Sequence, residues 1–94
     1  GKGVAEQIDP TNESAYWRDN YKTRPYAGTT ASYDDYGPAY GYGVSSYSKY
    51  PGRRFDEVED DLSREWNKVR GKSSLGWDNA RHATRDAYER LGSR

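Results

Sequence analysis

The chain has 94 residues, which is enough for one small domain, and its 15 basic and 15 acidic residues give zero formal net charge at pH 7. Ten residues are Tyr and three are Trp, whereas Val, Ile, Leu and Phe are scarce, so the sequence predicts an aromatic core and a marginally stable monomer. The absence of Cys excludes disulfide bonds and thiolate metal sites, and no apolar run is long enough to cross a bilayer.

The N-terminal region is predicted to combine an extended arm with a first helix. Residues 1–11 show no hydrophobic period, so they are interpreted as the arm. Asn12 can cap a short helix over residues 12–22, which Pro25 limits at its end. The whole of 12–94 is predicted to be a single small helical domain with Gly- and Pro-rich connections.

The Gly- and Tyr-rich stretch 34–49 has the spacing of a second helix. Tyr36, Tyr40, Val44 and Tyr47 fall at positions i, i+4, i+8 and i+11, which lie on one helical face.

Several residues of this stretch oppose a helix. Pro38 is tolerated only in a first turn, and each glycine costs up to about 1 kcal/mol relative to Ala. In favour of the helix, Ser32 and Asp35 can form a capping box at its N-terminus. We expect the glycines to permit the close approach of another backbone. They are Gly37, Gly41 and Gly43.

The strongest helical pattern covers residues 55–70. Its first half is acidic and its last turn is basic, which complements the helix dipole, and Gly71 is expected to terminate it. Its apolar stripe consists of Phe55, Val58, Leu62, Trp66 and Val69.

A fourth helix is predicted over residues 75–91, with Ser73 or Ser74 as its cap. Its apolar face includes Trp77 and Tyr88. Four short helices with short connections favour antiparallel neighbours, so we expect an all-α fold of two helical hairpins.

The acidic run of the third helix does not match a calcium loop. Counting from Asp56, Asp61 and Asn67 occupy the positions where an EF-hand requires Gly and Glu. The run is interpreted as a solvated helix face, and no metal or cofactor is predicted. The YGPAYGYG segment likewise lacks the spacing of a phosphate-binding loop.

His82, the single histidine, lies four residues from both Asp78 and Asp86 on one helical face, which is a geometry that can orient a base. No plausible nucleophile accompanies it, and Arg81 and Arg85 flank it. We interpret His82 as a surface salt-bridge residue and predict no catalytic residue, no small-molecule substrate and no enzyme activity.

Nucleic-acid binding is an alternative, because basic residues lie among the tyrosines and single-strand platforms combine these residue types. From Lys68 to Arg94 there are seven basic and three acidic residues. The chain as a whole is neutral, however, whereas nucleic-acid-binding domains are usually strongly basic.

The tyrosines favour either an interaction surface or an intramolecular core, and the sequence leaves both open. Residues 55–65 carry six acidic groups and one Arg, so the acidic face of one molecule can meet the basic face of another. The candidate core and interaction residues are Trp17, Tyr36, Tyr40, Phe55, Val58, Leu62, Trp66, Trp77 and Tyr88.

Four strings resemble an uncharacterised family of small, hydrophilic, Tyr-rich bacterial proteins. They are YWRDNYKTRPY (16–26), SYDDYGPAYGYG (32–43), YPGRRFDEVEDDL (50–62) and WDNARHATRDAY (77–88). The resemblance covers about residues 15–90 and implies a bacterial, cytoplasmic, stress-associated protein. It supplies no activity or site residue.

Together these features predict a non-enzymatic structural or stress-protective interaction protein. We expect it to act through self-association or as an accessory subunit of a larger assembly. Its predicted partner is itself or another protein, and no interaction with a membrane is predicted. Its Gly-rich, hydrophilic composition also resembles that of hydrophilins.

Overall fold

The computed structural model describes residues 8–27, 32–50 and 52–92, which form helices and connections without any strand. The predicted all-α class is confirmed. The elements in order are α2 (Pro10–Asn20), the 3-10 helix η1 (Tyr21–Thr23), α3 (Tyr33–Lys49), α4 (Phe55–Val69) and α5 (Trp77–Gly92).

Helix α2 begins earlier than the sequence predicted. The Asp9 carboxylate caps it by accepting from the backbone N–H groups of Thr11, at 3.1 Å, and Asn12, at 3.2 Å. Pro10 takes the first helical position, where its fixed φ is favourable and no N–H is needed. The cap is therefore Asp9 and not Asn12, and the predicted arm is wrong at its last two residues. Residues 1–7 lie outside the described residues.

Helix α3 continues through Pro38, which is its sixth residue and therefore lies beyond the first turn. The predicted side-chain cap from Ser32 is not formed. The carboxylate of Asp35 instead accepts from Ser74, through the backbone N–H at 3.0 Å and the hydroxyl at 2.8 Å. Packing of α3 against other helices compensates for the local defects that the sequence shows.

Helix α4 follows its predicted stripe except at the end. Phe55, Val58, Leu62 and Trp66 are buried, but Val69 has 44% of its surface exposed. The helix terminates as expected, because the residue after its cap is Gly71 with φ +57°. Val69 lies in the last turn of α4, where the neighbouring helices leave it uncovered.

Neither Ser73 nor Ser74 caps α5, in contrast to the prediction. Both serines bind Asp35. The Ser73 hydroxyl donates to the backbone carbonyl of Asp35 at 2.6 Å, and Ser74 binds the Asp35 carboxylate. Helix α5 begins at Trp77. The residue before it, Gly76, accepts a hydrogen bond through its carbonyl from the N–H of Ala80 at 2.9 Å. The serines thus join the α4–α5 connection to α3.

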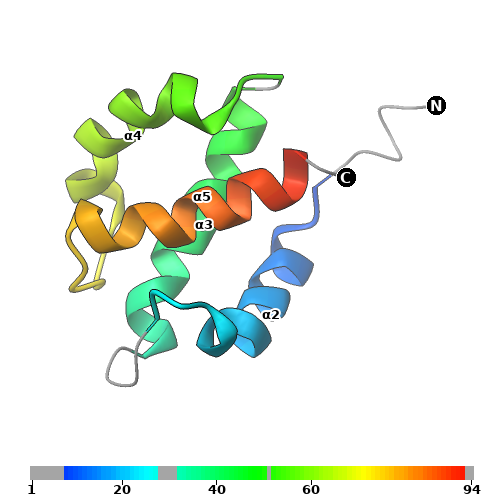
Figure 1. Ribbon diagram of the computed structural model, residues 1–94, viewed down its shortest axis with the longest axis vertical. Coiled ribbons are helices and arrows are strands. Elements are labelled where there is room, and N and C mark those ends of the chain that lie inside the picture. The colour runs from blue at the N-terminus through cyan, green and yellow to red at the C-terminus, as the bar shows by residue number, and fades with distance from the viewer. Residues whose placement is uncertain (1–7, 28–31, 51, 93–94) are drawn as a thin grey trace.

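The most extensive helix contact is between α3 and α5, which cross at the centre of the molecule, while α2 and α4 lie on opposite sides of the crossing (Figure 1). At the crossing, Gly43 lies against the backbone of Thr84. The Thr84 hydroxyl donates to the carbonyl of Ala39 at 3.0 Å. The expected close backbone approach is therefore confirmed at Gly43, whereas Gly41 faces open space.

Candidate functional site

The candidate residues lie mostly in the core. Trp77 is half-buried, and the other eight are buried. Trp17 stacks on Tyr40 with ring centroids 4.5 Å apart and planes 5° apart. Trp66 donates its indole N–H to the carbonyl of Leu75 at 2.9 Å. The buried ones are Trp17, Tyr36, Tyr40, Phe55, Val58, Leu62, Trp66 and Tyr88.

The segregated charges of α4 and α5 pair within the chain. Arg81 of α5 donates two hydrogen bonds to Glu59 of α4, at 2.6 and 3.1 Å. The hydrogen bond to Arg81 lowers the pKa of the Glu59 carboxyl below its ordinary value. Arg90 also binds the buried Glu13 of α2 at 3.0 Å. Much of the expected basic face is thus neutralised internally.

His82 is exposed, and its ring stacks on that of Tyr26 with centroids 5.4 Å apart. The predicted neighbour Asp86 binds other partners, and within the described residues no hydrogen bond joins it to His82. Asp78 makes no hydrogen bond to His82 within those residues either, so the histidine lacks the carboxylate orientation that the sequence pattern allowed for a base.

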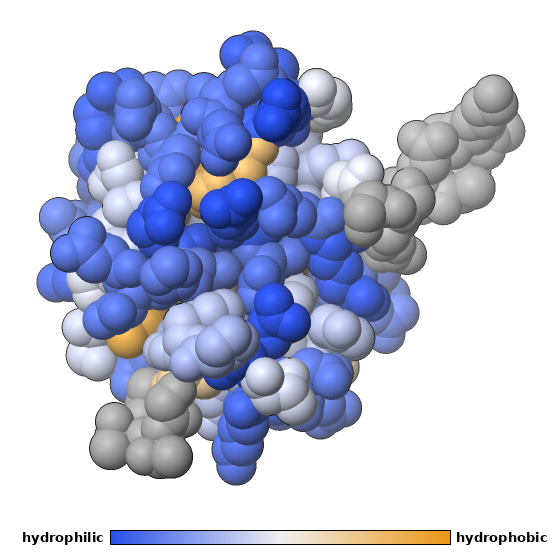
Figure 2. Space-filling model, viewed as in Figure 1, coloured by the Kyte–Doolittle hydropathy of each residue, from blue (hydrophilic) through white to orange (hydrophobic). Residues whose placement is uncertain are grey.

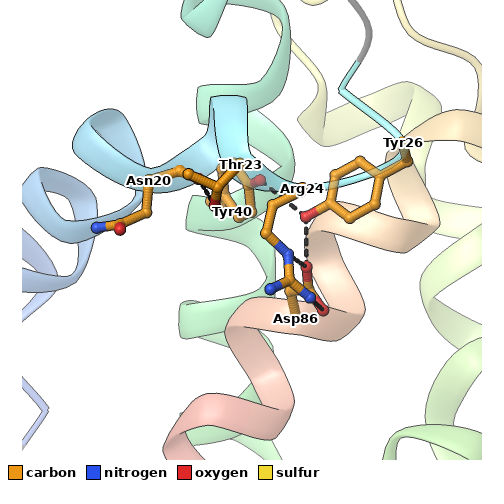
Figure 3. A network of polar contacts seen from close by, with 6 residues as sticks. All are labelled: Asn20, Thr23, Arg24, Tyr26, Tyr40 and Asp86. Atoms are coloured by element: carbon orange, nitrogen blue, oxygen red, sulfur yellow. Dashed lines mark hydrogen bonds and ion pairs between the residues drawn. The ribbon is translucent and has the colours of Figure 1, made fainter.

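The partners of Asp86 form a polar network between the η1–α3 connection, α3 and α5 (Figure 3). Arg24 donates to Asp86 through Nε at 2.8 Å and through a terminal nitrogen at 3.2 Å. The Tyr26 hydroxyl donates to Asp86 at 2.5 Å and lies 2.8 Å from the Tyr40 hydroxyl. Because the one proton of Tyr26 goes to Asp86, Tyr40 is the donor to Tyr26.

This network sets the acidity of its phenols. Burial is the main cause that raises the pKa of Tyr26 above its ordinary value, and the hydrogen bond to Asp86 raises this pKa further. Burial also raises the pKa of Tyr40. Both phenols therefore hold their protons more tightly than an exposed tyrosine does, and the Asp86 carboxylate accepts a hydrogen bond from one of them, Tyr26.

Two hollows flank the exposed side of α3. The first is about 440 Å³ and lies between α3 and α4, and the second is about 310 Å³ and lies between α2 and α3. Gly41 and Ser45 line both. We call the two hollows and the Gly41–Ser45 strip between them the α3 face.

The α3 face combines apolar walls with a charged edge. Trp17, Tyr40 and Val44 line the second hollow together with Ile8, and the exposed Val69 lines the first. Three charged residues also line the first hollow. They are Lys49, Asp61 and Glu65.

The described part of the chain contains neither a metal-binding cluster nor a membrane span. Among the residues that the structure describes, no group of three or more His, Asp or Glu side chains is arranged to hold a metal ion. None of the described helices combines the length and apolarity of a membrane span. The face on which α5 lies is mainly hydrophilic, with a hydrophobic patch between α4 and α5 (Figure 2).

Comparison with known proteins finds no matching family model, no matching curated protein and no matching solved structure. The α3 face and the Asp86 network are therefore the two features from which function can be argued. Neither was recognised in the sequence, because each joins residues of different helices. Gly41 was singled out there only as a glycine that favours close approach.

Proposed function

We propose that this protein is a non-enzymatic structural protein that associates with itself through the α3 face. The observation that carries the proposal is that two hollows meet along Gly41 and Ser45 on the exposed side of a central helix. A methyl group at Gly41 would find nothing within 4 Å, so the strip is open to an approaching molecule. Small residues at such a place let two helices pack at short distance.

The charges at the edge of the first hollow favour a second copy as the partner. Lys49 lies on α3, and Asp61 and Glu65 lie on α4 across the hollow. In a two-fold dimer the same patch meets itself, so the lysine of one copy faces the acidic side of the other. A surface that carries both signs of charge on opposite sides is complementary to its own rotated copy.

Val69 supplies an apolar contact at the same edge. It is one of two large hydrophobic residues exposed in the described regions, with 44% of its surface accessible. Burial of this side chain and of the hollow walls against a second copy would remove apolar surface from water. We propose that the resulting assembly has a stress-protective role, as the Gly-rich, hydrophilic composition suggests, and that it acts in the cytoplasm, as the resemblance to small bacterial proteins implies.

The test is the mass of the protein in solution across a concentration series, measured by sedimentation velocity. We expect a reversible shift from monomer to dimer in the native chain. In Gly41→Leu the added side chain fills open space and improves helix propensity, so the monomer stays folded while dimerisation is lost. A native chain that stays monomeric at every concentration would overturn the proposal.

A second pair of variants separates the surface from general charge effects. Val69→Lys places a cation in the last turn of α4, where the helix dipole favours it, but disrupts the apolar contact. Asn67→Lys adds the same charge at an exposed position of α4 that lines neither hollow. We expect weaker dimerisation only in the first variant, and equal effects of both would contradict the assignment of the surface.

A further inference from the structure

The aromatic rings near Asp86 form a connected path from the surface into the polar network. Tyr16, which is 37% exposed, contacts Trp17 edge-to-face with centroids 4.9 Å apart. Trp17 stacks on Tyr40 at 4.5 Å, and the Tyr40 hydroxyl lies 2.8 Å from that of Tyr26. Rings in van der Waals contact are good routes for short electron-transfer steps.

Tyr26 differs from the other tyrosines of the described regions in what its hydroxyl binds. Its proton points to a carboxylate, at 2.5 Å. A phenol that loses an electron becomes a very strong acid, so its oxidation is easiest where a base can take the proton. Four other tyrosines donate to neutral backbone carbonyls, which are poor proton acceptors. They are Tyr33, Tyr36, Tyr42 and Tyr88.

The residues along the path lack such an acceptor. The indole N–H of Trp17 is buried and has no hydrogen-bond partner in the described structure, so an oxidised Trp17 has nowhere to place its proton. The guanidinium of Arg90 lies 3.7 Å from the ring centroid of Tyr16 and disfavours positive charge there. These two observations make Trp17 and Tyr16 less favourable places for a stable radical than Tyr26.

We propose that Tyr26 and Asp86 form a radical site, at which one-electron oxidants are quenched by electron transfer through Tyr40, Trp17 and Tyr16. Tyr26 loses one electron to the path and its phenolic proton to Asp86, which leaves a neutral tyrosyl radical beside a carboxylic acid. The oxidant, for instance a peroxyl radical, gains the electron and takes a proton from water to become a hydroperoxide.

The network also allows the site to be restored. Tyr40 donates its hydrogen bond to the Tyr26 oxygen and stabilises the radical without giving up its proton. A small one-electron reductant, such as a thiol or ascorbate, returns the electron, and Asp86 returns the proton to Tyr26. The inference is independent of self-association.

The experiment uses the intact protein and a flash-generated ruthenium(III) polypyridyl oxidant, with electron paramagnetic resonance after rapid freezing. We expect a tyrosyl signal that is lost in Tyr26→Phe and kept in Tyr42→Phe. Tyr42 is a matched control, because its hydroxyl donates to the carbonyl of Leu62 at 2.8 Å. Equal signals in the two variants would overturn the proposal.

The role of the proton acceptor has its own test. Asp86→Asn keeps the size of the side chain and an accepting oxygen, but the amide is a poor base, so the radical yield is expected to fall while the helical circular dichroism is unchanged. If that variant unfolds, the rate of radical formation in the native protein is compared between H2O and D2O. Because a deuteron transfers more slowly than a proton, transfer to Asp86 requires a slower rate in D2O. An unchanged rate in D2O would contradict the proposed step.

Discussion

Gly43 of α3 lies directly against the backbone carbonyl of Thr84 in α5, so a methyl group at position 43 would overlap that carbonyl and lie 2.8 Å from the Cβ of Ala87. We expect Gly43→Ala to force the two central helices apart and to lower the free energy of unfolding by about 1–3 kcal/mol, despite the better helix propensity of Ala. Chemical denaturation followed by circular dichroism measures this loss.

Gly41→Ala is the matched control for that variant. It lies two residues away in the same helix, but its added methyl group meets nothing within 4 Å. The variant should therefore gain stability, by up to about 1 kcal/mol, from helix propensity alone. If both substitutions changed stability in the same direction, the close contact would not explain the effect at Gly43.

Trp66 is expected to be among the residues most important for folding. It is 1% exposed, contacts the rings of Tyr42 and Trp77, and donates to the carbonyl of Leu75. Trp66→Ala should lower the free energy of unfolding by about 3–5 kcal/mol, which is a large part of the stability of a small domain. Thermal unfolding measures the effect, and the half-buried Trp77→Ala should cost less.

The tyrosines predict a loss of stability in alkali. Burial, followed by the negative charge of Glu65, raises the pKa of Tyr42 to about 12, and burial also raises the pKa values of Tyr26 and Tyr40. The folded state therefore holds these protons more tightly than the unfolded state, whose phenols have the ordinary value of 10.0. The resulting stability is complete below pH 10 and declines as the pH rises through 12.

Ultraviolet absorbance of tyrosinate and circular dichroism, recorded together during an alkaline titration, test this coupling. We expect a fraction of the tyrosines to ionise only with the loss of helix. Ionisation of every tyrosine near its ordinary pKa in a chain that stays helical would contradict the burial of these hydroxyl groups.

The two kinds of ion pair should differ in their effect on stability. Asp86→Ala removes the acceptor of both Arg24 and the Tyr26 hydroxyl in a half-buried site, and should cost about 1–3 kcal/mol. Asp61→Ala removes the exposed pair with Arg64, and should change stability by about 1 kcal/mol or less. Denaturation of both variants compares them directly, and equal losses would count against a structural role for the network.

The helices themselves could largely be predicted because the patterns that specify them are local. The stripe from Phe55 to Trp66 repeats with the helical period and is buried as that period requires. The sequence does not place the start of α2 correctly, because Asp9 followed by Pro10 is typical of a turn as well as of a helix N-terminus. Val69 continues the apolar period but is exposed, because only the position of the neighbouring helices determines where a stripe stops being covered.

The sequence alone determined the all-α class, the aromatic character of the core and the expectation that a glycine of α3 would meet another backbone. Only the tertiary structure decided which glycine does so, and it brought Tyr26 to Asp86 across 60 residues of chain. The reason is that helical periodicity is encoded within a few turns, whereas the Asp86 network and the α3 face depend on how separate helices cross. The α3 face needs side chains of α2, α3 and α4 in place, and the Asp86 network needs α3, α5 and the η1–α3 connection.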